Sequence, residues 1–177
     1  MGLLYLVLNM LDKITKKERG LNVTGSFEVI TYKAGTKEEI KPRIKSKNLV
    51  VNNSGSGIQL LLDKITGLST GAVIKFIRLG TGTTAVVDAD NSLEIPKTTG
   101  GDDDDGYHDV TFIQNNGDNR ILEFFMSDQS LTDDTYTEIG VFFEKGEMYA
   151  RSLFPVDFSK AAGEDKQINY QLTFNNS

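Results

Sequence analysis

The chain has 177 residues, 38% of them hydrophobic and 25% charged, which is enough to bury the core of one domain. It has no cysteine and a single histidine, so disulfides and thiolate zinc sites are excluded and a histidine-based metal cluster is disfavoured. Lys and Arg outnumber Asp and Glu by 10 to 5 in residues 1–50, whereas the remainder has 9 against 20, so the acidic body should repel nucleic acid.

The first element that we expect is an amphipathic helix over residues 2–19. Four apolar residues have the i, i+3, i+4, i+7 spacing of one helical face: Leu4, Val7, Leu8 and Leu11. Gly20 is a suitable stop for this helix. The apolar run over residues 3–11 is too short to span a membrane, and it lacks the basic start and cleavage site of a signal peptide. The stripe therefore packs on the chain's own body, binds a partner subunit or lies on a membrane surface; we take it as a candidate partner-binding site.

A basic β-hairpin is expected next. Residues 26–32 and 40–47 alternate in the manner of strands, and Gly35 lies in the turn between them. Pro42 favours an edge position for the second strand, because proline donates no hydrogen bond to a neighbour. Together with the predicted helix, the hairpin would form an extension over residues 1–47 for assembly or anchoring, separate from a domain over residues 48–177.

The domain begins with the second predicted helix and a buried strand. Four apolar residues again follow the helical spacing: Ile58, Leu61, Leu62 and Ile65. Residues 72–79 read as a buried strand. The long stretch over residues 80–106 is rich in Gly and Asp, so we expect an exposed acidic loop.

The last third of the chain predicts hairpins. Asn-Gly at 116–117 lies between alternating runs at 108–113 and 120–126, which is a strong hairpin signal. Lys145-Gly146 separates two further runs, and residues 168–174 form a final strand. The predicted fold is an antiparallel β-sandwich with one short amphipathic helix.

Few residues indicate chemistry. Gly80 to Ala85 fit the dinucleotide fingerprint G-x-G-x-x-G/A, but no helix and parallel strand follow, so a tight turn is the better interpretation. Four adjacent carboxylates could contact a cation or a partner from the exposed loop: Asp102, Asp103, Asp104 and Asp105. They lack EF-hand spacing and repel one another, so we expect no metal. His108 opens a strand and is not expected to act as a general base. We predict no catalytic residue, no cofactor and no metal site.

Several short motifs, taken in order, resemble a family of proteins. They are Asn48-Leu49-Val50-Val51-Asn52, Ile77-Arg78-Leu79-Gly80-Thr81-Gly82-Thr83-Thr84, Leu93-Glu94, Glu138-Ile139-Gly140-Val141-Phe142, Ala150-Arg151-Ser152-Leu153-Phe154-Pro155 and Tyr170-Gln171-Leu172-Thr173-Phe174. This order, over residues 48–174, is similar to small structural proteins of tailed bacteriophages found in tail fibres, baseplates and necks. The resemblance implies a virion protein, assembled in the cytoplasm of the host bacterium, without an active site or cofactor.

We therefore expect a protein that acts through assembly with other virion proteins and as a homo-oligomer, a common form for symmetric particles. The alternative is a module of a tail fibre that binds a host receptor or a carbohydrate, with the loop over residues 80–106 as its contact surface. A third hypothesis is a glycan depolymerase. Two carboxylates would suffice for that chemistry, but nothing in the sequence marks such a pair, and we expect no enzyme.

Overall fold

The computed structural model describes residues 21–52, 57–58, 60, 63, 73–98, 100–101, 105–117, 119–131 and 133–176. Within these ranges the chain forms nine strands: β1 (Leu21–Lys33), β2 (Ile44–Val50), β3 (Ile74–Gly80), β4 (Tyr107–Asp109), β5 (Phe112–Asn116), β6 (Asn119–Met126), β7 (Asp134–Phe143), β8 (Met148–Lys160) and β9 (Glu164–Asn176). Paired strands run antiparallel in one sheet of order β4-β3-β7-β8-β2-β1-β9-β6-β5. The predicted mostly-β, antiparallel fold is confirmed.

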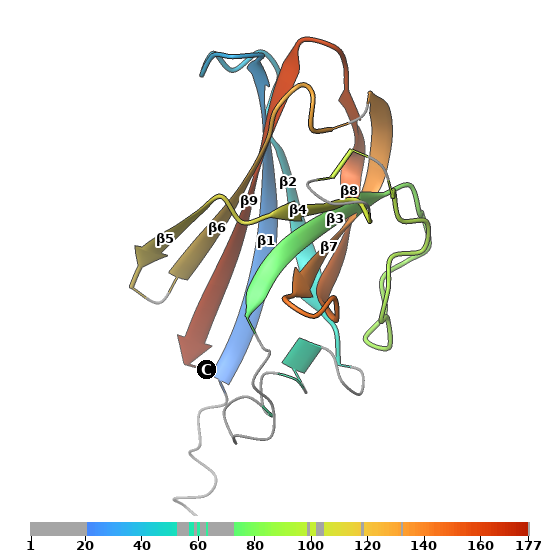
Figure 1. Ribbon diagram of the computed structural model, residues 1–177. Helices are drawn as coiled ribbons and strands as arrows, with labels where there is room; N and C mark the ends of the chain where they lie inside the picture. The colour runs from blue at the N-terminus through green and yellow to red at the C-terminus, as the bar shows by residue number, and fades with distance from the viewer. Residues whose placement is uncertain are drawn as a thin grey trace, which may run out of the picture.

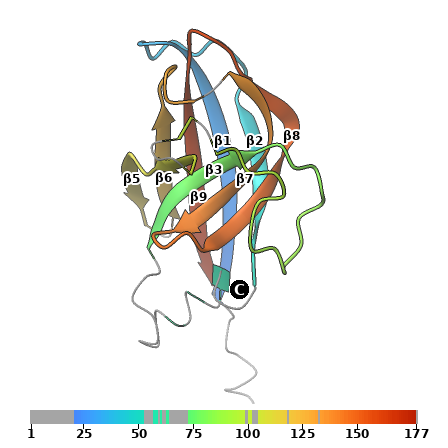
Figure 2. The ribbon, with the colours of Figure 1, turned by 45° about the vertical axis from the view of Figure 1, so that its right-hand side comes forward.

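The sheet curls until its two halves face each other (Figures 1 and 2). One half contains β1, β9, β6 and β5, the other contains β8, β7, β3 and β4, and β4 contacts β6 across the opening. One hydrophobic core takes side chains from both halves. Tyr170 of β9, for example, lies 4.9 Å from the ring of Phe27 in β1 and 6.4 Å from the ring of Tyr149 in β8. The structure thus has one curled sheet around a shared core, and the division into two layers stays a prediction.

Strand alternation explains how the core is filled. In β6, Leu122, Phe124 and Met126 are buried, while the residues between them are partly exposed. Because successive side chains point to opposite faces, this period of two places one face of the strand against the core. In β9 the same pattern buries Ile168 and Tyr170.

The two hairpins predicted in the last third are confirmed. In the first, Asn116 of β5 pairs with Asn119 of β6, and Gly117 in the turn has a φ of 61°. In the second, Gly146 has a φ of 86° between β7 and β8. Positive φ values are readily adopted by glycine, which is why these turns are visible in the sequence.

The predicted basic hairpin has a different setting from the one expected. β1 and β2 pair with each other, but β1 also pairs along its whole length with β9, and β2 pairs with β8. Both strands therefore lie in the middle of the sheet, and the predicted division of the chain at residue 47 falls inside β2. The edge position inferred from Pro42 is wrong: Pro42 precedes β2, which begins at Ile44, so it removes no hydrogen bond from the sheet.

Two helical predictions concern residues that are mostly or entirely undescribed. Gly57, Ile58, Leu60 and Asp63 are helical, and the rest of the second predicted helix lies outside the described residues. The first predicted helix, with the stripe of Leu4, Val7, Leu8 and Leu11, lies wholly outside them. Among the residues that are described, no helix is long and apolar enough to cross a membrane.

Candidate functional site

One buried ion pair joins Glu138 of β7 to Arg151 of β8. Glu138 has no exposed surface, and its Oε2 accepts a hydrogen bond of 2.9 Å from Arg151 Nε and lies 2.8 Å from Arg151 Nη2. Its other donors are main-chain N–H groups, those of Gly82 at 3.0 Å and Ile95 at 2.8 Å to Oε1 and that of Glu94 at 3.2 Å to Oε2. Groups of the protein itself therefore take up the hydrogen-bonding capacity of this buried carboxylate and hold it in place.

Two further carboxylates complete this cluster, which we call the loop anchor: Glu138, Arg151, Asp90 and Glu94. Arg151 Nη1 donates to Asp90 at 3.0 Å. Burial lowers the pKa of Arg151, but hydrogen bonds to Asp90 and Glu138 outweigh that effect and leave the pKa raised. All four members bind residues of 81–97 or belong to that segment. The loop anchor therefore fastens the first part of the predicted exposed loop to the sheet.

Glu94 shapes the turn at the start of this loop. Its Oε2 accepts hydrogen bonds of 2.7 Å from the main-chain N–H groups of Thr83 and Thr84, and its Oε1 accepts one of 2.7 Å from the Thr84 hydroxyl. The main-chain and hydroxyl hydrogen bonds from Thr84 lower the pKa of Glu94. Next to it, Leu93 is buried, so the loop also contributes an apolar contact to the core.

The glycines of the apparent dinucleotide fingerprint belong to the same cluster. A Cβ on Gly80 would lie 2.5 Å from Glu138 Oε1, and a Cβ on Gly82 would lie 2.6 Å from that atom. These glycines are needed because the main chain passes close to the Glu138 carboxyl group at both positions. The interpretation as a turn thus has a physical explanation.

A second set of buried charges lies at the turn between β8 and β9. Lys160 Nζ contacts Asp128 Oδ1 and Asp133 Oδ1, each at 2.6 Å. Lys166 Nζ donates to Thr31 Oγ1 and Glu164 Oε2, each at 2.9 Å. Burial lowers the pKa of Lys166, although Glu164 opposes this effect. Both ammonium groups are engaged by partners within the protein, which indicates a structural role.

The other predicted site residues are only partly described. Asp105 is exposed, and Asp102, Asp103 and Asp104 lie outside the described residues. Within the described part of the chain, no group of three or more His, Asp or Glu side chains could hold a metal ion. His108, the middle residue of β4, is buried and pairs with Ile77 of β3.

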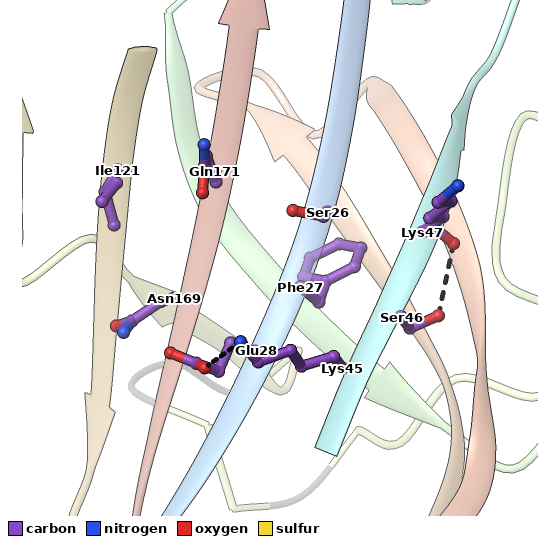
Figure 3. A pocket seen from close by; sticks show the side chains of 9 residues that line it. All are labelled: Ser26, Phe27, Glu28, Lys45, Ser46, Lys47, Ile121, Asn169 and Gln171. Carbon is purple, nitrogen blue, oxygen red and sulfur yellow. Dashed lines mark hydrogen bonds and ion pairs between the residues drawn. The ribbon is translucent and has the colours of Figure 1, made fainter. Parts of the chain in front are cut away.

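A polar groove lies on the outer face of β6, β9, β1 and β2 (Figure 3). It has a volume of about 440 Å³. Short polar side chains form its floor, where Ser26 pairs with Gln171 and Glu28 pairs with Asn169. Its sides come from the longer side chains of Lys45 and Lys47 on β2 and Ile121 on β6. We call this feature the polar groove.

Amide atoms remain available in the polar groove. Asn169 Oδ1 accepts a hydrogen bond of 2.8 Å from Gln167, and Gln171 Nε2 donates to Thr173 at 3.4 Å. Neither Asn169 Nδ2 nor Gln171 Oε1 is hydrogen-bonded to any part of the chain that the structure describes. Glu28 is already paired with Lys45 at 3.1 Å. The groove thus offers free donors and acceptors beside an ion pair, a surface suited to a ligand rich in hydroxyl groups.

Strand β5 forms one edge of the sheet and has no buried residue. Its sequence, Phe-Ile-Gln-Asn-Asn, contains no charge. Phe112 and Ile113 are each 57% exposed, and they belong to opposite faces because they pair with Glu123 and Leu122 of β6. Within the described ranges, β6 is the only strand paired with β5. A strand of this kind exposes both apolar side chains and main-chain hydrogen-bonding groups.

Sequence reasoning did not find Glu138, Arg151 or the β5 edge as functional features. Comparison with known proteins gives no match to a family model, to a curated protein or to a solved structure. The geometry of the chain itself therefore carries the functional interpretation.

Proposed function

We propose that this protein is a structural component of a tailed-phage virion, in the tail, baseplate, neck or fibre, and that it acts through protein–protein assembly. The observation that supports this proposal is the uncharged β5 edge. Natural sheets shield exposed edges with charges, proline, bulges or covering loops, because a free edge recruits strands of other chains. An edge without such protection is suited to strand addition, in which main-chain hydrogen bonds supply affinity.

The buried charges support the same proposal. The loop anchor and the lysines near the β8–β9 turn use their charges to fasten loops to the sheet, which favours a rigid structural protein over an enzyme. We also infer that the two halves of the curled sheet serve as the layers of the predicted sandwich, because one core lies between them. The predicted apolar stripe, Leu4, Val7, Leu8 and Leu11, would be a second assembly element.

Substitution at the edge tests the proposed function. Ile113→Lys places a charge on β5 at an exposed position, so folding should be unaffected while association weakens by about tenfold or more, since burying an Ile contributes about 1.5–3 kcal/mol and 1.4 kcal/mol corresponds to tenfold. Static light scattering over a concentration series gives the mass. The matched control is Val156→Lys on β8, because Val156 is 59% exposed. Equal association of Ile113→Lys and wild type, alone and with neighbouring virion proteins, would contradict the proposal.

The polar groove favours a second candidate function, carbohydrate binding at a host surface. The expected location differs from the acidic loop inferred from the sequence, because the free amide atoms lie on the sheet. Gln171→Ala and Asn169→Ala should each weaken binding of host-surface glycans, measured by NMR titration of the full chain. Thr24→Ala on the same face is a control outside the groove lining. Binding that survives both groove substitutions would exclude this site.

A further inference from the structure

We propose that β5 pairs with β5 of a second copy of this chain across a two-fold axis, so that two molecules form one continuous sheet. This inference rests on the proposed function of β5 as an assembly edge and names the partner. It depends on three features: the hydrogen-bonding direction of β5, the position of its apolar residues and its lack of charge.

The β5–β6 turn determines which main-chain groups point outward. Asn116 and Asn119 flank a two-residue turn, and such a turn is closed by a hydrogen-bonded pair. Because hydrogen-bonded and non-hydrogen-bonded pairs alternate along antiparallel strands, Asn116, Gln114 and Phe112 direct their N–H and C=O groups toward β6. Ile113 and Asn115 then direct theirs outward, away from the sheet, where a second strand can receive them.

The apolar residues select the register of the pair. A two-fold axis perpendicular to the sheet leaves each face of the sheet on its own side. Residues directly opposite each other share a face, so the axis must place one β5 residue opposite the same residue of the second copy. An axis at Ile113 places Ile113 opposite its own copy, with exchange of two main-chain hydrogen bonds. Each Phe112 then lies opposite Gln114 of the second copy and diagonal to the other Phe112, at about 7–8 Å. Both exposed apolar side chains gain an apolar cross-strand neighbour in this arrangement.

Charge favours self-pairing as well. The chain has a net charge of −6, so two copies carry like net charge and repel each other at long range. β5 contains no charged residue, so strands meeting there bring no like charges into direct opposition. A self-complementary patch of this type is what an isologous two-fold interface requires.

The pairing has a consequence for the polar groove. Phe112 and Gln114 lie on the face that carries the groove, because Gln114 pairs with Ile121 and Ile121 pairs with Gln171. The two-fold axis therefore places both grooves on one side of the dimer. Their centres are six strand spacings apart, about 30 Å along the sheet. Two grooves at this separation would bind a repetitive surface with avidity.

A cysteine scan tests the pairing directly, since the natural chain has no cysteine. Single cysteines replace each residue from 112 to 116 in the full chain, and Asp109→Cys on β4 serves as the control at the other edge. After mild oxidation, disulfide-linked dimers are measured by non-reducing electrophoresis. Ile113→Cys should convert almost completely, because the paired Cα atoms lie about 5.5 Å apart, within disulfide range. Yield should fall on both sides of residue 113, and Asp109→Cys should stay monomeric.

A dimer yield that is as low at all five positions as in Asp109→Cys would overturn the self-pairing. The result is separable from the proposed function. If the profile is flat while Ile113→Lys still abolishes assembly with another virion protein, the edge binds a different partner. If Ile113→Lys changes no assembly, the proposed function itself fails. Circular dichroism of every variant checks that the sheet remains folded.

Discussion

The two edges of the sheet end in different ways. At one edge, β4 covers residues 76–78 of β3, and the loop continues the pairing: Lys97 N–H donates to Leu79 O at 2.9 Å, and Thr81 N–H donates to Ile95 O at 3.0 Å. At the other edge, β5 has five exposed residues and no charge. The loop anchor thus helps to close the β3 edge, whereas the β5 edge stays open, and this difference is the basis for proposing that β5 acts in assembly.

The largest expected loss of stability comes from breaking the loop anchor, which holds the loop against the β3 edge. Arg151→Met leaves the buried carboxylate of Glu138 without its charged partner, and breaking a buried pair in this way costs about 3–5 kcal/mol. Urea denaturation measures the loss in the free energy of unfolding. Arg43→Met is the control, because Arg43 forms exposed ion pairs with Glu28 and Glu39 and should change stability far less. Equal effects of the two substitutions would contradict the role of the loop anchor.

A smaller loss is expected from Gly82→Ala. The new Cβ would lie 2.5 Å from Glu94 Cβ and 2.6 Å from Glu138 Oε1, so the loop must shift away from the sheet. Overpacking of this kind costs about 1–3 kcal/mol. Thermal unfolding measures the effect, and Thr83→Ala, which keeps the main-chain donor to Glu94, is the control. Unchanged stability of Gly82→Ala would show that the loop does not depend on close approach to the anchor.

A substitution in the predicted N-terminal stripe tests whether β5 or the stripe contributes more to association. Leu4→Asp with Leu8→Asp removes the apolar face of the predicted helix. If β5 is the main assembly edge, this double substitution should weaken association less than Ile113→Lys does, as measured by light scattering on the full chain. A complete loss of association would transfer the assembly role to the stripe.

Acid should release the loop at the β3 edge before it affects the β5 edge. The pKa of Glu94 is lowered by hydrogen bonds from Thr84, and the pKa of Asp134 is lowered by its hydrogen bond with Lys97. A carboxyl with a lowered pKa contributes stability that is complete above its unfolded pKa, about 4.5 for Glu, and is lost as pH falls through the folded pKa. β5 has no titratable group. Limited proteolysis with pepsin between pH 5 and pH 2 should therefore release the loop over residues 81–97 before the β5–β6 hairpin is cut; the reverse order would contradict this assignment.

Local signals account for what the sequence predicted. The hairpins follow from alternation and from glycine turns such as Gly117, which depend on neighbouring residues only. The central position of β1 depends on pairing with β9, which lies more than a hundred residues away, and no local pattern encodes it. Pro42 misled the prediction because the strand begins two residues after it.

The loop anchor was missed for a similar reason. Glu138 and Arg151 each occupy one position in an apolar strand, where a charged residue usually faces solvent. Both side chains are buried because the loop over residues 81–97 covers them, and this loop ends more than 40 residues before Glu138. A signal was nevertheless present: Gly80 and Gly82 follow a buried strand, and paired glycines without a helix indicate close approach of the main chain to another group.

Hydrogen–deuterium exchange at β5 tests the central claim most directly. At high protein concentration, the amides of Ile113 and Asn115 should exchange slowly, because they donate to a second strand. The amides of residues 113 and 115 should exchange fast after dilution or in the Ile113→Lys variant. The exchange rates of the β4 amides should stay unchanged. Fast exchange of Ile113 and Asn115 at every concentration, with or without other virion proteins, would show that β5 is a free edge and would contradict its role in assembly.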